Sequence, residues 1–183
     1  MIKRILSQLH RYVILAMISF IFWAWIFTLL TDTVPAKKIV LYSDAPVFDD
    51  RGLAAELEKD LPEGIRMIQA HPFSYAMFDT SEPLSADLYI LSESDIGILL
   101  DQLNPIPYEK DGFVSEGTLY GILLHDAEGS FSRLDSFSKY ATPEKQDEDF
   151  YLCFNKDSLH LGSWNGSEDD AALKIAERIL TIP

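Results

Sequence analysis

Three pairs of polar residues stand where short apolar runs end, and their side chains are the ones best suited to bind a ligand. The pairs are Ser43 with Asp44, Ser92 with Glu93, and His125 with Asp126. Ligands of open α/β sheets bind beyond the carboxyl ends of the strands, so these six residues are expected to share one rim. Three carboxylates and an imidazole could bind a cation there, or hydrogen-bond to sugar hydroxyls. The commoner alternative is that these side chains only cap loops.

Trp164 is a seventh candidate, since it follows Gly162 and Ser163 in a short stretch of small residues. An exposed indole could stack on the ring of a bound sugar. A tryptophan in such a position more often covers the core, here above the last helix of the chain. The sequence leaves both interpretations open.

No motif in the sequence is typical of an enzyme, a metal site or a nucleotide cofactor. G-x-S-x-G, H-E-x-x-H and the glycine-rich phosphate loops are absent, and the four histidines lack the spacing of metal ligands. Cys153 is the single cysteine, so no intramolecular disulfide can form. It lies in the apolar run FYLCF and is expected to be a buried, unreactive side chain. We therefore expect neither catalysis nor a cofactor; an extracytoplasmic hydrolase with an unfamiliar site is a less favoured alternative.

The elements that would position the rim alternate between strands and helices. Apolar runs predict strands at residues 38–42, 65–70, 86–91 and 120–124. Apolar side chains spaced three and four apart predict helices at residues 49–61 and 94–103. This order favours right-handed crossovers and a mostly parallel sheet covered by helices.

Two further features belong to the last third of the chain. Residues 150–154 and 158–161 flank Asn155, Lys156 and Asp157, and this pattern predicts a hairpin that makes the sheet mixed. Ser167 is expected to cap a last helix. The fold expected is α/β, a single three-layer lobe with a mixed, mostly parallel sheet.

Residues 13–30 read VILAMISFIFWAWIFTLL and carry no charge. A helix rises 1.5 Å per residue, so a hydrocarbon core of about 30 Å needs roughly 20 such residues. The positive-inside rule places the preceding Lys3, Arg4 and Arg11 in the cytoplasm. The alternative is a signal peptide cleaved after Ala36, although such peptides usually have shorter apolar cores. The organisation expected is a cytoplasmic N-terminus at 1–11, a transmembrane signal anchor at 12–30, a linker at 31–37 and an extracytoplasmic domain at 38–183.

Charge is distributed unevenly along the chain. All 29 acidic residues and 12 of the 15 cationic residues lie beyond residue 31, which gives that part a formal charge of −17. Nucleic acids and anionic lipids are bound by cationic surfaces, so neither is an expected partner. A solvated acidic surface is the simplest interpretation, and a cationic partner or ligand is compatible with it.

The order of several segments resembles one lobe of a known family of binding proteins. The segments are KKIVLYSDA, ADLYILSESDIGILLDQLNPI, GTLYGILLHDA and FYLCFNKDS, within roughly residues 38–161. Together they look like the N-terminal lobe of the extracellular solute-binding proteins of bacterial ABC importers. That family has two lobes, so the resemblance implies a truncated, membrane-anchored lobe with a periplasmic-binding-protein-like fold.

The resemblance and the apolar stretch together imply a function without catalysis. The expected protein is a single-pass accessory or ligand-sensing subunit of a bacterial transport system, with an ABC permease and a small solute as expected partners. The alternative is a structural subunit of a larger membrane complex, in which the apolar helix packs against partner helices.

Overall fold

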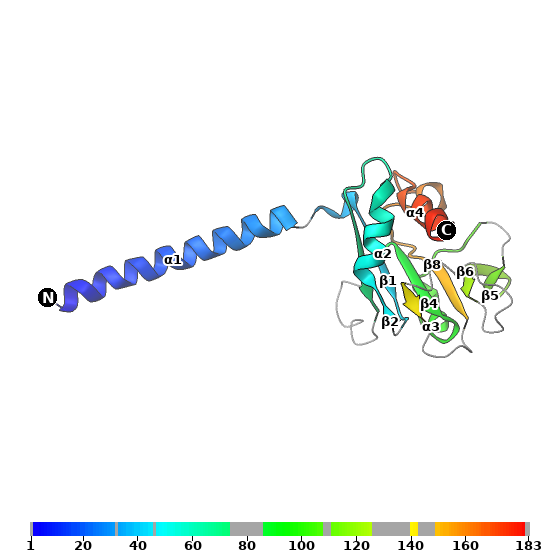
Figure 1. The fold of residues 1–183 in the computed structure, drawn as a ribbon, viewed down its shortest axis with the longest axis horizontal. Helices are drawn as coiled ribbons and strands as arrows, with labels where there is room; N and C mark the ends of the chain where they lie inside the picture. The colour runs from blue at the N-terminus through cyan, green and yellow to red at the C-terminus, as the bar shows by residue number, and fades with distance from the viewer. Residues whose placement is uncertain are drawn as a thin grey trace. The chain divides into compact units, whose positions relative to one another are not determined.

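The computed structural model describes residues 2–31, 33–45, 47–73, 86–107, 111–125, 140–142 and 149–181. Two compact units divide the chain, Met1–Val34 and Pro35–Pro183. The first unit consists of one helix, and the second contains every strand that is described (Figure 1).

Helix α1 (Ile2–Thr31) is 30 residues long. Within it Leu9–Thr28 is long and apolar enough to cross a membrane. Large side chains along this segment are exposed, among them Phe20 and Trp23. Length and composition fit a membrane anchor, and they fit an N-terminal signal sequence equally.

The second unit is built on a sheet of six strands in the order β3-β1-β4-β8-β6-β5. These strands are β1 (Lys38–Ser43), β3 (Met67–Pro72), β4 (Leu88–Ser92), β5 (Gly112–Ser115), β6 (Thr118–His125) and β8 (Phe150–Phe154). β1 pairs in parallel with both β3 and β4, whereas the pairs β4–β8, β8–β6 and β6–β5 are antiparallel. A separate antiparallel pair joins β2 (Val47–Phe48) and β7 (Ala141–Thr142).

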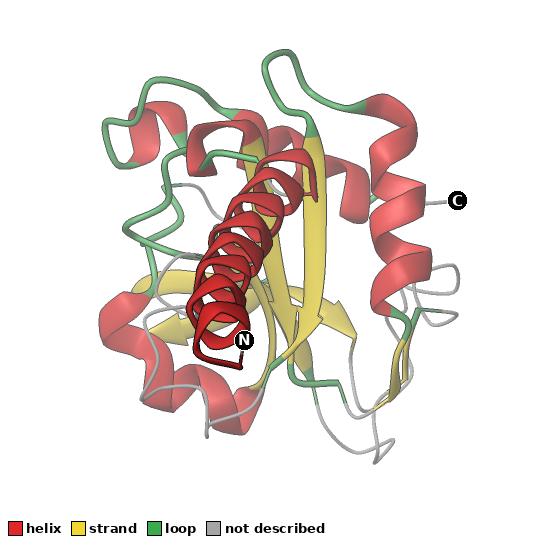
Figure 2. Ribbon diagram, turned by 90° about the vertical axis from the view of Figure 1, so that its left-hand side faces the viewer, coloured by secondary structure: helices red, strands yellow, loops and turns green. Residues whose placement is uncertain are grey.

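Helices cover both faces of the sheet, as Figure 2 shows. α2 (Asp50–Leu57) and α4 (Ala171–Ile179) pack on one face, where they bury Leu53, Leu57, Ile175 and Ile179 against Ile39, Leu41 and Ile90 of the strands. α3 (Glu93–Leu99) covers the opposite face, where Ile96 and Leu99 meet Tyr42, Tyr89 and Leu91. Successive strand residues point to opposite faces, so alternate residues of β1 and β4 feed the two cores.

Short 3₁₀ turns complete the unit, and their bounds are Pro35–Lys37, Glu58–Asp60, Leu100–Gln102 and Gly162–Trp164.

The six-stranded sheet and the helices on its two faces confirm the predicted α/β class, the mixed sheet and the three layers. The sheet is parallel only over β3-β1-β4, so the prediction of a mostly parallel sheet holds at one end alone. It fails at the other end because β8 returns antiparallel between β4 and β6.

The predicted hairpin at residues 150–161 is wrong. β8 ends at Phe154, and residues 158–161 contain a turn at Leu159 and His160 instead of a strand. Side chains explain the difference: the Asp157 amide donates to Asn155 Oδ1 at 3.0 Å, and the His160 amide donates to Ser158 Oγ at 3.1 Å. Such local bonds satisfy the backbone without a partner strand.

The last helix begins later than predicted, at Ala171. Ser167 does not cap it, because Ser167 Oγ accepts a hydrogen bond from the Leu161 amide at 2.8 Å. Asp169 Oδ1 instead accepts from the amide of Ala171 at 3.0 Å. The carboxylate of Asp169 thus holds the first turn of α4.

Candidate functional site

The carboxyl ends of β1 and β4 lie side by side, as the sequence predicts for neighbouring parallel strands. The amide of Ser92 donates to Asp44 Oδ2 at 2.7 Å, and the amide of Asp44 donates to the Ile90 carbonyl at 3.1 Å. These two bonds join the loop after β1 to the last residues of β4. Ser43, Asp44, Ser92 and Glu93 therefore meet at one edge of the sheet.

The residues around Asp44 differ in what they offer a ligand. Ser43 is fully buried, and its hydroxyl oxygen accepts from the Ala45 amide at 3.2 Å, so it serves the loop. Ser92 is buried with its Oγ 3.1 Å from that of Ser94. Glu93 opens α3 with an exposed side chain, while its amide donates to the Asp149 carbonyl at 3.1 Å.

Asp44 has the most unusual environment of this edge. Burial, with a smaller contribution from the neighbouring Asp95, raises the pKa of its carboxyl from 3.8 to about 7, against the hydrogen bonds from Ser92 that lower it. Its Oδ1 atom is buried and has no hydrogen-bond partner among the described residues. Because a buried acceptor without a donor is costly, this carboxyl destabilises the fold in its charged form.

We call Asp44, Ser92, Glu93, Ser94 and Asp95 the carboxyl-edge cluster. Ser94 and Asp95 are not among the candidates that the strand-end rule names, and they lie in the first turn of α3, after its N-cap Ser92. Their spacing is a usable signal for the cluster, since the first turn of a helix that follows a strand faces the same edge. The cluster combines two hydroxyls with three carboxyl groups.

His125 lies at the same level of the sheet, two strands away from Ser92. Both residues are register partners of Phe150, which stands between them on β8. Neighbouring strands are about 4.8 Å apart, so the backbones of Ser92 and His125 are separated by roughly 10 Å. The His125 side chain and Asp126 lie outside the part of the chain for which side chains are described.

Trp164 is not part of the carboxyl edge. Its ring packs against Phe154 with centroids 5.1 Å apart and the planes at 66°. Phe154 is the register partner of Leu88, the first residue of β4, so this contact lies at the opposite edge of the sheet. Trp164 is half-buried against the core, which agrees with the interpretation that it covers the core.

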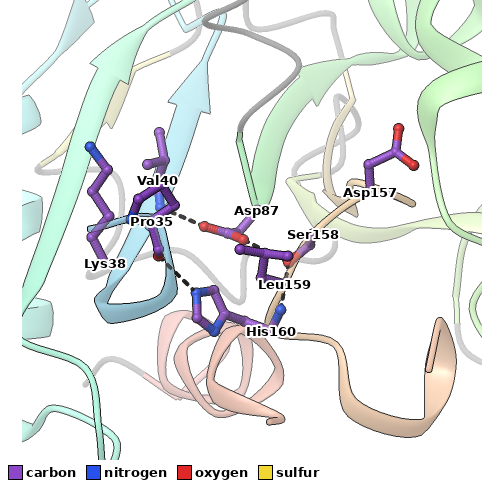
Figure 3. Close-up of a pocket in the computed structure, with 8 residues that line it drawn as sticks. All are labelled: Pro35, Lys38, Val40, Asp87, Asp157, Ser158, Leu159 and His160. Atoms are coloured by element: carbon purple, nitrogen blue, oxygen red, sulfur yellow. Dashed lines mark hydrogen bonds between the residues drawn. The ribbon is translucent and has the colours of Figure 1, made fainter. Parts of the chain in front are cut away.

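A cavity of about 340 Å³ lies at that opposite, amino-terminal edge (Figure 3). Its lining residues are Pro35, Lys38, Val40, Asp87, Asp157, Ser158, Leu159 and His160. Within it Asp87, Ser158 and His160 are almost completely buried and are linked by hydrogen bonds. We call these three residues with Asp169 the amino-edge network.

Asp87 is the structural centre of the amino-edge network. Its Oδ2 accepts from the Val40 amide at 2.8 Å, and its Oδ1 accepts from the Ser158 hydroxyl at 2.6 Å. Burial raises its pKa, whereas these two bonds and the charge of His160 lower it. The Asp87 amide also donates to the Val40 carbonyl, so this residue extends the β1–β4 ladder by one step.

His160 holds the other end of the network. Its Nδ1 lies 2.8 Å from Asp169 Oδ1 and 3.0 Å from Oδ2, and its Nε2 lies 3.3 Å from the Pro35 carbonyl oxygen. No local pattern in the sequence points to this cluster, because Asp87 and His160 are brought together only by the return of β8 beside β4.

The amino-edge network contains a hydroxyl and an imidazole, and the contacts of each are defined. The Ser158 hydroxyl faces Asp87, and both ring nitrogens of His160 face other acceptors, so the pair does not form a nucleophile–base contact. Burial raises the pKa of the Cys153 thiol well above its usual value, which keeps it protonated. Among the described residues no three acidic, histidine or cysteine side chains are arranged to hold a metal ion.

Comparison of the chain with protein-family models, curated proteins and solved structures found no match.

Proposed function

We propose that this protein is a membrane-anchored, non-enzymatic binding subunit. In this proposal α1 crosses the cell membrane with the N-terminus in the cytoplasm and displays the α/β unit outside. The unit acts as a solute-binding-protein-like accessory or ligand-sensing domain of a bacterial transport system. The apolar helix and the acidic α/β unit support this arrangement.

The observation that carries the proposal is the buried Oδ1 atom of Asp44, which has no hydrogen-bond partner in the described part of the chain. Asp44 lies at the carboxyl edge although burial and the neighbouring Asp95 both disfavour the charged form of its carboxyl. Oδ1 still lacks a donor among the described residues, while Oδ2 is occupied by the Ser92 amide. Groups held in unfavourable environments cluster at functional sites, so we assign solute binding to this edge.

The chemistry of the carboxyl-edge cluster limits the class of solute. The carboxyl groups of Asp44 and Asp95 can accept hydrogen bonds, or can share one proton between them. The hydroxyl groups of Ser92 and Ser94 can donate or accept hydrogen bonds. A small solute that donates hydrogen bonds from hydroxyl or ammonium groups would complement this set. An anionic solute would meet three carboxyl groups and be repelled.

A thermal-shift screen tests this proposal. The full chain in detergent micelles would be heated with sugars, short peptides and organic amines, since a ligand that binds the folded state raises the melting temperature. We expect a hydroxylated or cationic solute to raise it, and carboxylate solutes to leave it unchanged. No rise with any neutral or cationic solute would remove the sensing function.

A further inference from the structure

The side chain of His160 connects the start of the α/β unit to its last helix. The ring is 1% exposed and lies between Asp169, whose carboxylate accepts from the first amide of α4, and Pro35, the first residue of the unit. Figure 3 shows the ring and its hydrogen bond to Pro35 among the residues that line the cavity. Both atoms that face its nitrogens are oxygens that can only accept.

The number of N–H groups on the ring decides how many of these acceptors it can bind at once. A neutral imidazole carries one N–H, so it can serve either the Asp169 carboxylate or the Pro35 carbonyl. The remaining nitrogen would then direct a lone pair at an oxygen only 2.8 or 3.3 Å away. The imidazolium carries two N–H groups and serves both acceptors at once.

We infer that His160 is a proton-dependent clasp that fastens the 3₁₀ turn Pro35–Lys37 to the α/β unit. When the ring is protonated it holds Pro35 and Asp169 together. When the ring loses its proton, the remaining N–H serves the nearer and charged acceptor, Asp169 at 2.8 Å, so the bond to Pro35 at 3.3 Å is lost and Pro35 is released.

The clasp has a fixed point next to it. The carbonyl of Lys37 accepts from the Arg66 amide at 2.8 Å, a backbone bond that does not depend on pH. Release therefore frees Pro35 and Ala36 but leaves Lys37 in place. Two freed residues lengthen the connection to α1 by about 7 Å; given the membrane anchor of the proposed function, protonation would then set the reach of the domain on its tether.

Two acidic groups lie close to the ring. Asp169 makes direct contact from the segment before α4, and Asp87 interacts with the ring charge from the start of β4.

The other charged groups nearby are partly balanced. Lys38 of β1 and Asp157 line the same cavity with opposite charges. In the first turn of α4, Asp170 and Lys174 pair with each other at 2.8 Å. Asp87 is thus the second group whose titration could affect the clasp, and the experiment must separate it from His160.

A spin label on the turn measures the clasp directly. Ala36 is exposed, so Ala36→Cys can be labelled in the folded full chain in micelles, while Cys153 is fully buried. We expect the label to be held at about pH 5 and to become several-fold more mobile towards about pH 8. A label whose mobility does not change over this range would overturn the clasp.

Two variants identify the group that is responsible. His160→Gln cannot take up a proton, so its label should have the same mobility at both pH values, whereas His71→Gln is a matched control that should keep the transition. Should His160→Gln fail to fold, Asp169→Asn preserves an acceptor for the Ala171 amide and should move the transition to lower pH. A transition that persists in His160→Gln, or is unmoved in Asp169→Asn, would assign it to Asp87 or another acid. All the residues involved belong to the α/β unit, so this result is independent of solute binding.

Discussion

Individual residues show how far the sequence defines the site. The strand-end rule correctly predicts that Ser43, Asp44, Ser92 and Glu93 share one edge, because β1 and β4 are parallel neighbours. It does not predict that the Ser43 hydroxyl is used by the Ala45 amide, or that Asp44 Oδ1 lacks a donor among the described residues. Those properties depend on depth of burial, which residue type and spacing do not fix.

Replacing Asp44 by asparagine should change how stability depends on pH. The carboxyl has a pKa of about 7 in the folded protein and 3.8 when unfolded, so the folded state holds the proton more tightly. The stability that this carboxyl contributes to the folded state is fully present below about pH 4 and is lost as the pH rises through 7. Asparagine keeps an acceptor for Ser92 and never becomes charged.

We therefore expect Asp44→Asn to match the wild type at about pH 4 and to exceed it by roughly 2 kcal/mol at pH 8. Urea unfolding of the full chain in micelles at both pH values measures this difference. Asp101→Asn, which removes an exposed acid, serves as the control and should show no such rise. An Asp44→Asn variant no more stable than the wild type at pH 8 would contradict the raised pKa.

For helices and strands, position along the chain can be predicted from local sequence, whereas the order of strands in the sheet cannot. Helices α2, α3 and α4 and strands β1, β3, β4, β6 and β8 all lie near the positions predicted for them, since apolar spacing is a local signal. β5 has no such signal, because Gly112–Ser115 is short and mostly half-exposed. The place of β8 between β4 and β6 depends on a chain reversal that no local pattern encodes.

Packing between β6, β8 and α3 allows a direct test. A Cβ atom on Gly121 would lie 2.9 Å from Tyr151 Cβ, 3.0 Å from Cys153 Sγ and 3.2 Å from Ile96 Cδ1. Gly121→Ala should therefore destabilise the protein by about 1–3 kcal/mol, because the core is already full. Chemical denaturation measures the change.

Gly97→Ala is the matched control for this substitution. Nothing lies within 4 Å of a Cβ at this position in α3, so the methyl group should stabilise the helix by up to about 1 kcal/mol. Equal effects of the two substitutions would show that α3 and the sheet are not packed as described.

At the scale of the whole molecule, the fate of α1 decides where the domain works. An anchor and a signal sequence share the length and composition of Leu9–Thr28. If α1 is an anchor, the protein recovered from a bacterial membrane fraction should have the intact mass of 20.7 kDa. A shorter product in the soluble fraction, beginning after Ala36, would show a cleaved signal sequence and would remove the tether.

In the proposed function, the carboxyl-edge cluster binds a solute. Calorimetric titration of the most stabilising solute into the full chain tests it directly, with Ser158→Ala as a control at the amino-terminal edge. We predict one site per chain, weakened at least about tenfold by Asp44→Asn and unchanged by Ser158→Ala, because a bond to a charged group contributes about 1.5–3 kcal/mol. Binding that is unaffected by Asp44→Asn but lost in Ser158→Ala would place the site at the other edge and contradict the claim.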